Sequence, residues 1–200
     1  MPDKEIYLDM DGVCVDFMSA VLRTHGMDPE GVMADWATRH RGEVFPQPLI
    51  GMEPQTFFTN EAMADAAFWS SLVPYAWFDV LFEEMSKIGH VIFLTAPTGA
   101  PGCVAGKHIW LKDKFGNDFQ DFIFTRHKER LAHGSAFLVD DLAHNTQRFM
   151  ERDGHGVLFP QIWNRNADIG DKVNYVIEYL RTGVDPAPFN AAPSGSDGHS

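Results

Sequence analysis

The chain has 200 residues, a hydrophobic content of 44% and a formal net charge of −12. This length suits one domain, or one core domain with an insertion, and the apolar content is sufficient for a packed core. The acidic charge argues against a broad nucleic-acid footprint and against attachment to an anionic membrane, although it leaves room for a small anionic substrate. No apolar run reaches the length of a membrane span, no signal-peptide pattern is present, and Cys14 and Cys103 lie far apart. We therefore expect a cytoplasmic protein.

The first predicted element is a short apolar strand, Glu5-Ile6-Tyr7-Leu8, which runs into Asp9-Met10-Asp11-Gly12. Positions i and i+2 of an extended chain point to the same side, so Asp9 and Asp11 should face one small volume. Gly12 permits the turn that follows. Two carboxylates this close favour a shared cation or proton, while an ordinary Asx-type turn after a strand is the simpler alternative.

The segment 16–75 does not continue the strand pattern. It is rich in aromatic residues and Met and is interrupted by Pro and Gly. Because it is far longer than an ordinary connection, we expect a small, mostly helical cap that is inserted after the first strand and lies over the strand ends. Residues 1–15 and 76–183 would then form the core domain, and the Pro-, Ala-, Gly- and Ser-rich residues 184–200 a disordered tail.

Beyond residue 75, short apolar strands alternate with amphipathic helices. The predicted elements in chain order are helix 78–87, strand 91–94, helix 104–115, strand 122–124, strand 136–139, helix 142–151 and strand 156–159. The strands are continuously apolar, as expected for a parallel sheet that is buried on both faces. This order predicts an α/β fold, a doubly wound parallel sheet in a three-layer sandwich.

Polar residues follow successive predicted strands. Thr95 follows the second strand, Lys128 comes shortly after the third, and Asp140 and Asp141 follow the fourth. Singly, these could be a strand end, a solvated lysine and a helix N-cap pair. Ligands of open parallel sheets bind beyond the carboxyl ends of the strands, where these residues would join Asp9 and Asp11. Such a set of carboxylates suits a Mg²⁺ site.

The four motifs, Asp9-Met10-Asp11-Gly12-Val13, Thr95, Lys128 and Asp140-Asp141, resemble those of the haloacid dehalogenase superfamily of phosphohydrolases. Within it the chain most resembles the 5′(3′)-deoxyribonucleotidases, through three local stretches. These are residues 11–17, Phe68-Trp69-Ser70-Ser71-Leu72-Val73-Pro74 and residues 107–116. The resemblance spans roughly residues 5 to 165 and is weakest between Leu22 and Gln55.

The resemblance implies a phosphatase mechanism. Asp9 would be the nucleophile that forms an aspartyl-phosphate, and Asp11 the general acid and base. Thr95 and Ala96 would contact the phosphoryl oxygens, and Lys128 would neutralise their charge. The Mg²⁺ cofactor would be held by Asp9, Asp11, Asp140 and Asp141, with the backbone carbonyl as the ligand from Asp11. The resemblance leaves open which of Asp140 and Asp141 binds the metal directly.

The substrate that the resemblance implies is a deoxyribonucleoside monophosphate. Phe17 and Trp69 align with positions that line the base pocket of that family, although cap-to-core packing would equally explain both. Another small phosphate ester, such as a sugar phosphate or a phosphorylated cofactor, is the alternative substrate, and a non-catalytic nucleotide-binding protein is the alternative class. Leu142 stands where human members of the family have Arg, which affects base and sugar preference more than the phosphatase chemistry. Family members with a similar cap often form homodimers.

Overall fold

In the computed structural model, which describes residues 4–187, a five-stranded parallel sheet forms the centre. The strand order is β3-β2-β1-β4-β5. The strands are β1 (Lys4–Leu8), β2 (Gly89–Thr95), β3 (Phe122–Phe124), β4 (Ala136–Asp140) and β5 (His155–Leu158). In register, Leu8 lies beside Phe93 of β2 and Val139 of β4, so the first and fourth strands end at the same edge of the sheet.

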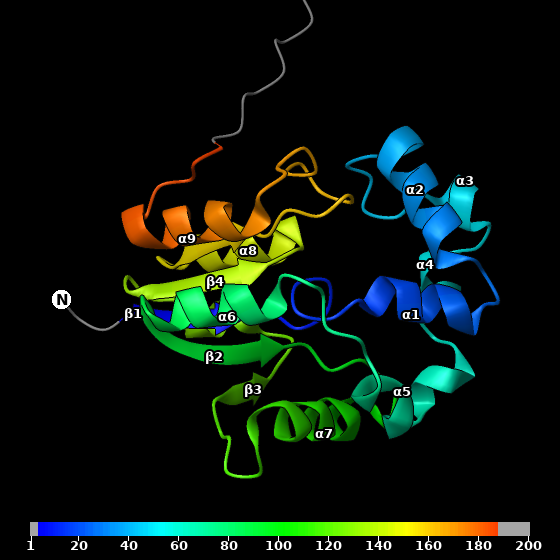
Figure 1. The fold of residues 1–200 in the computed structure, drawn as a ribbon, viewed down its shortest axis with the longest axis horizontal. Helices are drawn as coiled ribbons and strands as arrows, with labels where there is room; N and C mark the ends of the chain where they lie inside the picture. Colours follow the sequence, from blue (N-terminus) through cyan, green and yellow to red (C-terminus); the bar gives the residue numbers. More distant parts are fainter. Residues whose placement is uncertain (1–3, 188–200) are drawn as a thin grey trace, which may run out of the picture.

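Helices cover both faces of the sheet (Figure 1). From residue 78 onward the helices are α6 (Phe78–Ser86), α7 (Cys103–Phe115), the 3-10 helix η2 (Lys128–Leu131), α8 (Ala143–Met150) and α9 (Lys172–Thr182). Alternate residues of β1 pack against the helices on opposite faces of the sheet. Ile6 and Leu8 belong to the same apolar cluster as α6 and α9, whereas Tyr7 packs against Phe149 of α8, with ring centroids 6.1 Å apart. The predicted three-layer α/β fold with a parallel sheet is confirmed.

A group of short helices lies between β1 and α6 in chain order. They are α1 (Phe17–Thr24), α2 (Pro29–Arg39), α3 (Gln47–Ile50), α4 (Pro54–Phe57), the 3-10 helix η1 (Glu61–Ala64) and α5 (Ala66–Ser70). Figure 1 shows α1 to α5 gathered on the side towards which the arrowheads of β2 and β3 point. We call residues 17–70 the α1–α5 segment. Its mostly helical character agrees with the sequence, while the division of the chain into core and cap stays a prediction.

Side-chain caps set the beginnings of several of these helices. Asp16, Asp28 and Asp65 each accept a hydrogen bond from a backbone N–H in the first turn of α1, α2 and α5, respectively. Such caps satisfy donors that have no partner inside the helix. The segment also has its own buried side chains, among them Trp36 and Phe57. Short capped helices around a few large apolar rings therefore hold this segment together.

Beyond residue 75, element bounds differ from the prediction by at most two residues, but the 3-10 helix η2 and the α-helix α9 were not predicted. α9 follows the fifth strand, begins at the capping residue Asp171 and ends before Gly183, whose φ is 72°. Of the predicted tail, residues 188–200 lie outside the described residues. The first part of the tail is placed, because Asp185 accepts a hydrogen bond from the Tyr175 hydroxyl at 2.8 Å. Among residues 4–187, no helix combines the length and the apolar character that crossing a membrane requires.

Candidate active site

The loop directly after β1 forms one wall of the candidate site. The backbone N–H of Asp9 donates to the Val139 carbonyl of β4 at 3.0 Å, which continues the sheet by one residue. The chain then turns at Gly12, whose φ is 77°, and Gly12 N–H bonds the Val15 carbonyl. A side chain at position 12 would be strained in this conformation and would also strike Asp141, whose Oδ2 lies 2.4 Å from the place of a Cβ.

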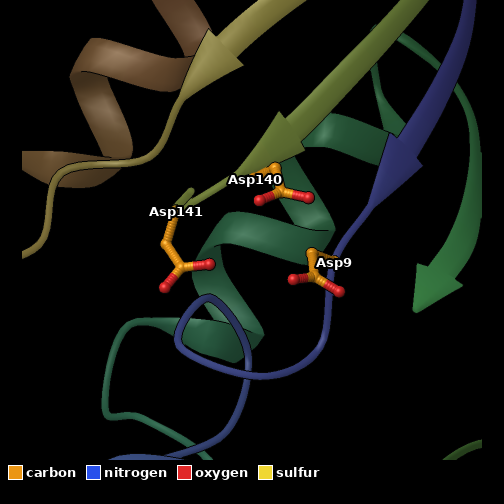
Figure 2. Close-up of side chains that lie close together, drawn as sticks. All are labelled: Asp9, Asp140 and Asp141. Carbon is orange, nitrogen blue, oxygen red and sulfur yellow. The ribbon is translucent and has the colours of Figure 1, made fainter. Parts of the chain in front are cut away.

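Three carboxylates meet at this edge of the sheet (Figure 2). Asp9, Asp140 and Asp141 are buried, and each offers an oxygen within 4.8 Å of the others. Burial raises the pKa of Asp9 to about 6, with Asp140 and Asp11 acting in the same direction and Lys128 opposing them. Burial and the nearby Asp140 also raise the pKa of Asp141 well above its usual range. So many buried acids need a compensating cation.

Lys128 supplies part of that compensation. Its Nζ lies 2.8 Å from Asp9 Oδ1 and 2.6 Å from Asp140 Oδ2, and its side chain is only 3% exposed. Burial alone would lower the pKa of Lys128, but Asp140 and Asp9 outweigh it, so the pKa is raised and the ammonium stays charged. The solvated-lysine alternative is therefore wrong. The structure brings Lys128 together with Asp9, which follows β1, and Asp140, the last residue of β4.

The two adjacent aspartates have different surroundings. Asp140 accepts hydrogen bonds from Lys128, from the Leu142 backbone N–H at 2.9 Å and from Asn145 Nδ2 at both oxygens. Asp141 accepts one side-chain hydrogen bond, from Trp163 Nε1 to its Oδ2 at 2.7 Å, and it lines the cavity described below, whereas Asp140 does not. Because Asp140 is saturated by donors, Asp141 is better placed to bind a ligand or ion.

Asp11 is not one of the three clustered carboxylates. Its Oδ2 accepts a hydrogen bond at 2.6 Å from Lys107, a lysine of α7 that is fully buried. The same ammonium donates to Thr95 Oγ1 at 2.7 Å and to the Ala96 carbonyl at 3.2 Å. Asp11 Oδ1 is buried and has no hydrogen-bond partner in the structure. In Asp11, Oδ2 is fixed by Lys107 while Oδ1 is buried and free, an arrangement that suits a carboxyl group that carries a proton to and from a substrate.

A cavity of about 610 Å³ opens above these residues. Its polar end includes Asp9, Asp11, Lys128 and Asp141. Its other end is apolar and is lined mainly by the α1–α5 segment, through Phe17, Met18, Val44, Phe45, Pro54 and Phe58. The cavity thus joins a charged, buried carboxylate cluster to an aromatic wall, and its size suits a small organic ligand.

The predicted substrate-contacting residues are placed differently from one another. Phe17 and Ala96 line the cavity, but Trp69 does not and has no exposed surface. Trp69 lies against Phe17, with centroids 5.4 Å apart and planes 15° from parallel, and donates its Nε1 hydrogen to the Met63 carbonyl. The Lys107 ammonium lies 5.2 Å from the Trp69 ring centroid. Trp69 therefore supports the aromatic wall from behind, and Thr95, also fully buried, supports Lys107.

Sequence reasoning missed three side chains that donate hydrogen bonds to the clustered aspartates or to Asp11, namely Lys107, Asn145 and Trp163. For Lys107 a signal existed, because it lies on the buried face of α7 with Cys103, Trp110 and Leu111, where a lysine needs a partner. Asn145 and Trp163 carry no such signal, since their roles depend on how α8 and the loop after β5 pack. The sequence also predicted that the backbone carbonyl of Asp11 binds the metal, and this stays a prediction.

Comparison with known families identifies the chain. A family model described as 5′ nucleotidase, deoxy (pyrimidine), cytosolic type C protein matches residues 4–174. The chain belongs to this 5′-nucleotidase family. The family and the haloacid dehalogenase fold make it an enzyme of the phosphatase or 5′-nucleotidase kind, as the motifs predicted. A comparison with curated protein sequences gave no match.

Solved structures support the fold of this 5′-nucleotidase family member. A haloacid dehalogenase-like hydrolase from Streptococcus pneumoniae matches with a TM-score of 0.50 at 14% identity, covering 89% of this chain and 98% of that one. A haloacid dehalogenase superfamily hydrolase from Geobacter sulfurreducens matches with a TM-score of 0.51 at 12% identity, covering 89% and 96%. At these identities the likeness concerns the fold alone.

Proposed function

We propose that this chain is a Mg²⁺-dependent phosphomonoesterase that forms an aspartyl-phosphate on Asp9 and acts on deoxyribonucleoside monophosphates. One observation carries the proposal. Asp9 lines the polar end of the cavity, held by Lys128 on one side and close to Asp141 on the other. A carboxylate is a weak nucleophile, so it depends on positioning and on neutralised charge, and both are provided here.

The donor set fits Mg²⁺, which prefers oxygen ligands and few carboxylates. Of the three buried carboxylates, Asp9 and Asp140 pair with the Lys128 ammonium, so one more cation would balance the set. Asp9 and Asp141 would hold the ion with the Asp11 backbone carbonyl, while Asp140, saturated by donors, would mainly position Lys128. The bound ion would neutralise charge on the transferring phosphoryl group.

The proposed reaction has two displacements. In the first, an Asp9 carboxylate oxygen attacks phosphorus, the bond to the ester oxygen breaks, and Asp11 gives that oxygen its proton. In the second, Asp11 takes a proton from water, the water oxygen attacks phosphorus, and the bond to Asp9 breaks. Phosphate leaves and both aspartates return to their first state. The unpaired Oδ1 of Asp11 supports its part in both steps.

The nucleotide substrate is supported by the shape of the cavity. The apolar end holds Phe17, Phe45 and Phe58, whose ring faces and edges suit a planar base. Base stacking on an aromatic side chain contributes about 1–3 kcal/mol per base in single-strand binders. A sugar phosphate would leave this wall without a partner, so the aromatic rings favour a nucleotide.

The test is phosphate release from nucleoside and deoxynucleoside monophosphates, sugar phosphates and FMN, with Mg²⁺ and with EDTA. We expect release that needs Mg²⁺ and is fastest with deoxynucleotides. Asp9→Asn should lose turnover by at least about 10³-fold while keeping its fold, because the amide is not a nucleophile. Asp113→Asn, at an exposed position of α7, is the matched control.

Each part of the proposal can fail separately. Near-normal turnover by Asp9→Asn would refute the nucleophile. Release led by a sugar phosphate would keep the chemistry and refute the substrate, and release that persists in EDTA would refute the metal. No release from any ester would favour a protein that binds nucleotides without turnover.

A further inference from the structure

The loop between β5 and α9 contains several buried polar side chains that the proposed reaction does not use. Gln161, Asn164 and Asn166 are each at most 5% exposed, and Trp163 is 3% exposed. All four have hydrogen-bond partners within the described chain. A buried, fully bonded polar network of this kind fixes the position of what it contacts.

One part of this loop holds Asp141 from two directions. Trp163 Nε1 donates to the carboxylate Oδ2 at 2.7 Å, and Asn164 Nδ2 donates to the Asp141 backbone carbonyl at 2.8 Å. Gly12 closes the other side, where a Cβ would lie 2.4 Å from Asp141 Oδ2 and 3.1 Å from the Trp163 ring. The carboxylate therefore sits in a narrow slot, with Oδ2 bound to the indole and its other oxygen left for a ligand.

The other side of the same indole meets the α1–α5 segment. The Trp163 ring lies 5.8 Å from the ring of Trp36 in α2, and Trp36 is fully buried. Next to this pair, the Gly42 backbone N–H donates to the Ile162 carbonyl at 2.7 Å, and Arg41 forms an ion pair with Asp168. Trp163 thus touches both a carboxylate of the reaction centre and the segment that forms the aromatic wall of the cavity.

We infer that Trp163 is a positioning residue that sets the Mg²⁺ affinity of the site and makes it depend on the packing of the α1–α5 segment. The inference rests on the proposed function, in which Asp141 is a metal ligand. The indole hydrogen bond fixes the rotamer of Asp141, and Trp36 fixes the indole. Groups that orient metal ligands in this way commonly change metal affinity by about 10- to 100-fold when they are removed.

The first experiment measures Mg²⁺ binding to the full chain by isothermal titration calorimetry. Trp163→Phe keeps an aromatic ring but removes the donor, and we expect its Mg²⁺ affinity to fall about 10- to 100-fold. At saturating Mg²⁺, its KM for the substrate should stay within about twofold, because the phenyl ring keeps an aromatic side chain in the cavity lining and the change removes only the donor to Asp141. Trp163→Tyr, which also lacks the indole N–H, is the second variant if the first does not fold.

Trp110→Phe is the matched control. Trp110 is also buried and donates its Nε1 hydrogen at 2.9 Å, but to the Leu72 carbonyl and not to a carboxylate. It should bind Mg²⁺ like the unchanged protein. A Trp163→Phe protein that binds Mg²⁺ as tightly as this control would overturn the inference.

The second experiment tests the coupling. Trp36→Leu should weaken Mg²⁺ binding in the unchanged background and have much less effect when combined with Trp163→Phe, because the two residues act on the same carboxylate. Additive effects would overturn the coupling. Asp141→Asn tests the proposed metal site separately from the role of Trp163. If it binds Mg²⁺ normally, or if the unchanged protein binds none, the proposed metal site fails and the inference with it.

Discussion

At the scale of single residues, the contacts of Lys107 are the most consequential arrangement that the motifs did not predict. Its ammonium joins Asp11, Thr95 and the Ala96 carbonyl, and it lies over Trp69. A lysine with no exposed surface is costly unless it is paired and fully bonded, and these contacts meet that condition. Since Lys107 does not line the cavity, its effect on the substrate passes through Asp11 and Thr95.

We therefore expect Lys107→Met to lower kcat by about 10²-fold or more, since Asp11 would lose the contact that aims it, and general acid–base catalysis contributes about 10²- to 10⁴-fold. The KM should change much less. Steady-state kinetics with the best substrate of the panel provides the measurement.

Lys112→Met is the control for Lys107→Met. It lies in the same helix, and its ammonium donates to the backbone carbonyls of Asn117 and Phe119 and lies 5.7 Å from the Phe122 ring centroid. It should keep kcat within about twofold. If both variants lose the same activity, the role of Lys107 is general helix stability and not the placement of Asp11.

At the scale of elements, the close contact between α5 and α7 places the aromatic wall. A Cβ at Gly106 of α7 would lie 2.3 Å from the Ala66 carbonyl oxygen and 2.5 Å from the Trp69 Cβ. A Cβ at Gly102, one turn earlier, would also meet the α5 backbone. Gly106 and the N-cap residue Gly102 thus let α5 approach α7 closely, and this brings Trp69 against Phe17 and Lys107.

Gly106→Ala should destabilise the protein by about 1–3 kcal/mol, because the added methyl meets backbone that cannot move away cheaply. This is opposite to the usual helix effect, in which Ala is favoured over Gly by about 0.5–1 kcal/mol. Urea denaturation gives the free energy of unfolding.

Ala105→Gly, at the exposed neighbouring position, measures the preference of this helix for Ala over Gly where there is no close packing. It should lower the free energy of unfolding by about 0.5–1 kcal/mol. A Gly106→Ala protein that is more stable than the unchanged one would contradict the close packing of α5 on α7.

The sequence predicted the strands well because buried parallel strands are short, continuous apolar runs, as Ala136–Asp140 shows. It also predicted which residues follow the strands, and therefore that Asp9, Lys128 and Asp140 would meet. α9 was missed although its apolar residues Val173, Val176, Ile177 and Leu180 recur at helical spacing. The sequence could not predict that Asp141 lines the cavity while the oxygens of Asp140 are occupied by hydrogen-bond donors. These placements depend on tertiary contacts from Asn145 and Trp163.

At the scale of the whole molecule, Lys172 connects distant parts of the fold. From the start of α9, its Nζ lies 4.2 Å from the Trp77 ring centroid and donates to Gln161 Oε1 at 3.0 Å. Gln161 in turn donates to the Gly12 carbonyl, and Trp77 Nε1 donates to the Val13 carbonyl at 2.9 Å. The loop that carries Asp9 and Asp11 is therefore held against the far end of the chain.

This lysine also links global stability to pH. Burial lowers the pKa of Lys172 to about 8 from its usual 10.5, and within residues 4–187 it forms no ion pair. Below about pH 8 the lysine is charged in both the folded and the unfolded chain, so the folded state bears the full cost of the buried charge. Between about pH 8 and the usual pKa the unfolded chain binds more protons, so the contribution of Lys172 to stability rises with pH.

Lys172→Met removes this dependence. The quantity to compare is the unfolding free energy of the variant minus that of the unchanged protein. This difference should fall as the pH rises from about 7 to about 10, because only the unchanged protein gains stability there. Urea denaturation of both proteins at several pH values measures it. Lys87→Met provides the control, since Glu84 and Glu83 raise the pKa of the exposed Lys87 and its difference should not fall in this range. A Lys172→Met difference that is constant or grows with pH would mean that the ammonium is as well solvated in the fold as in the unfolded chain.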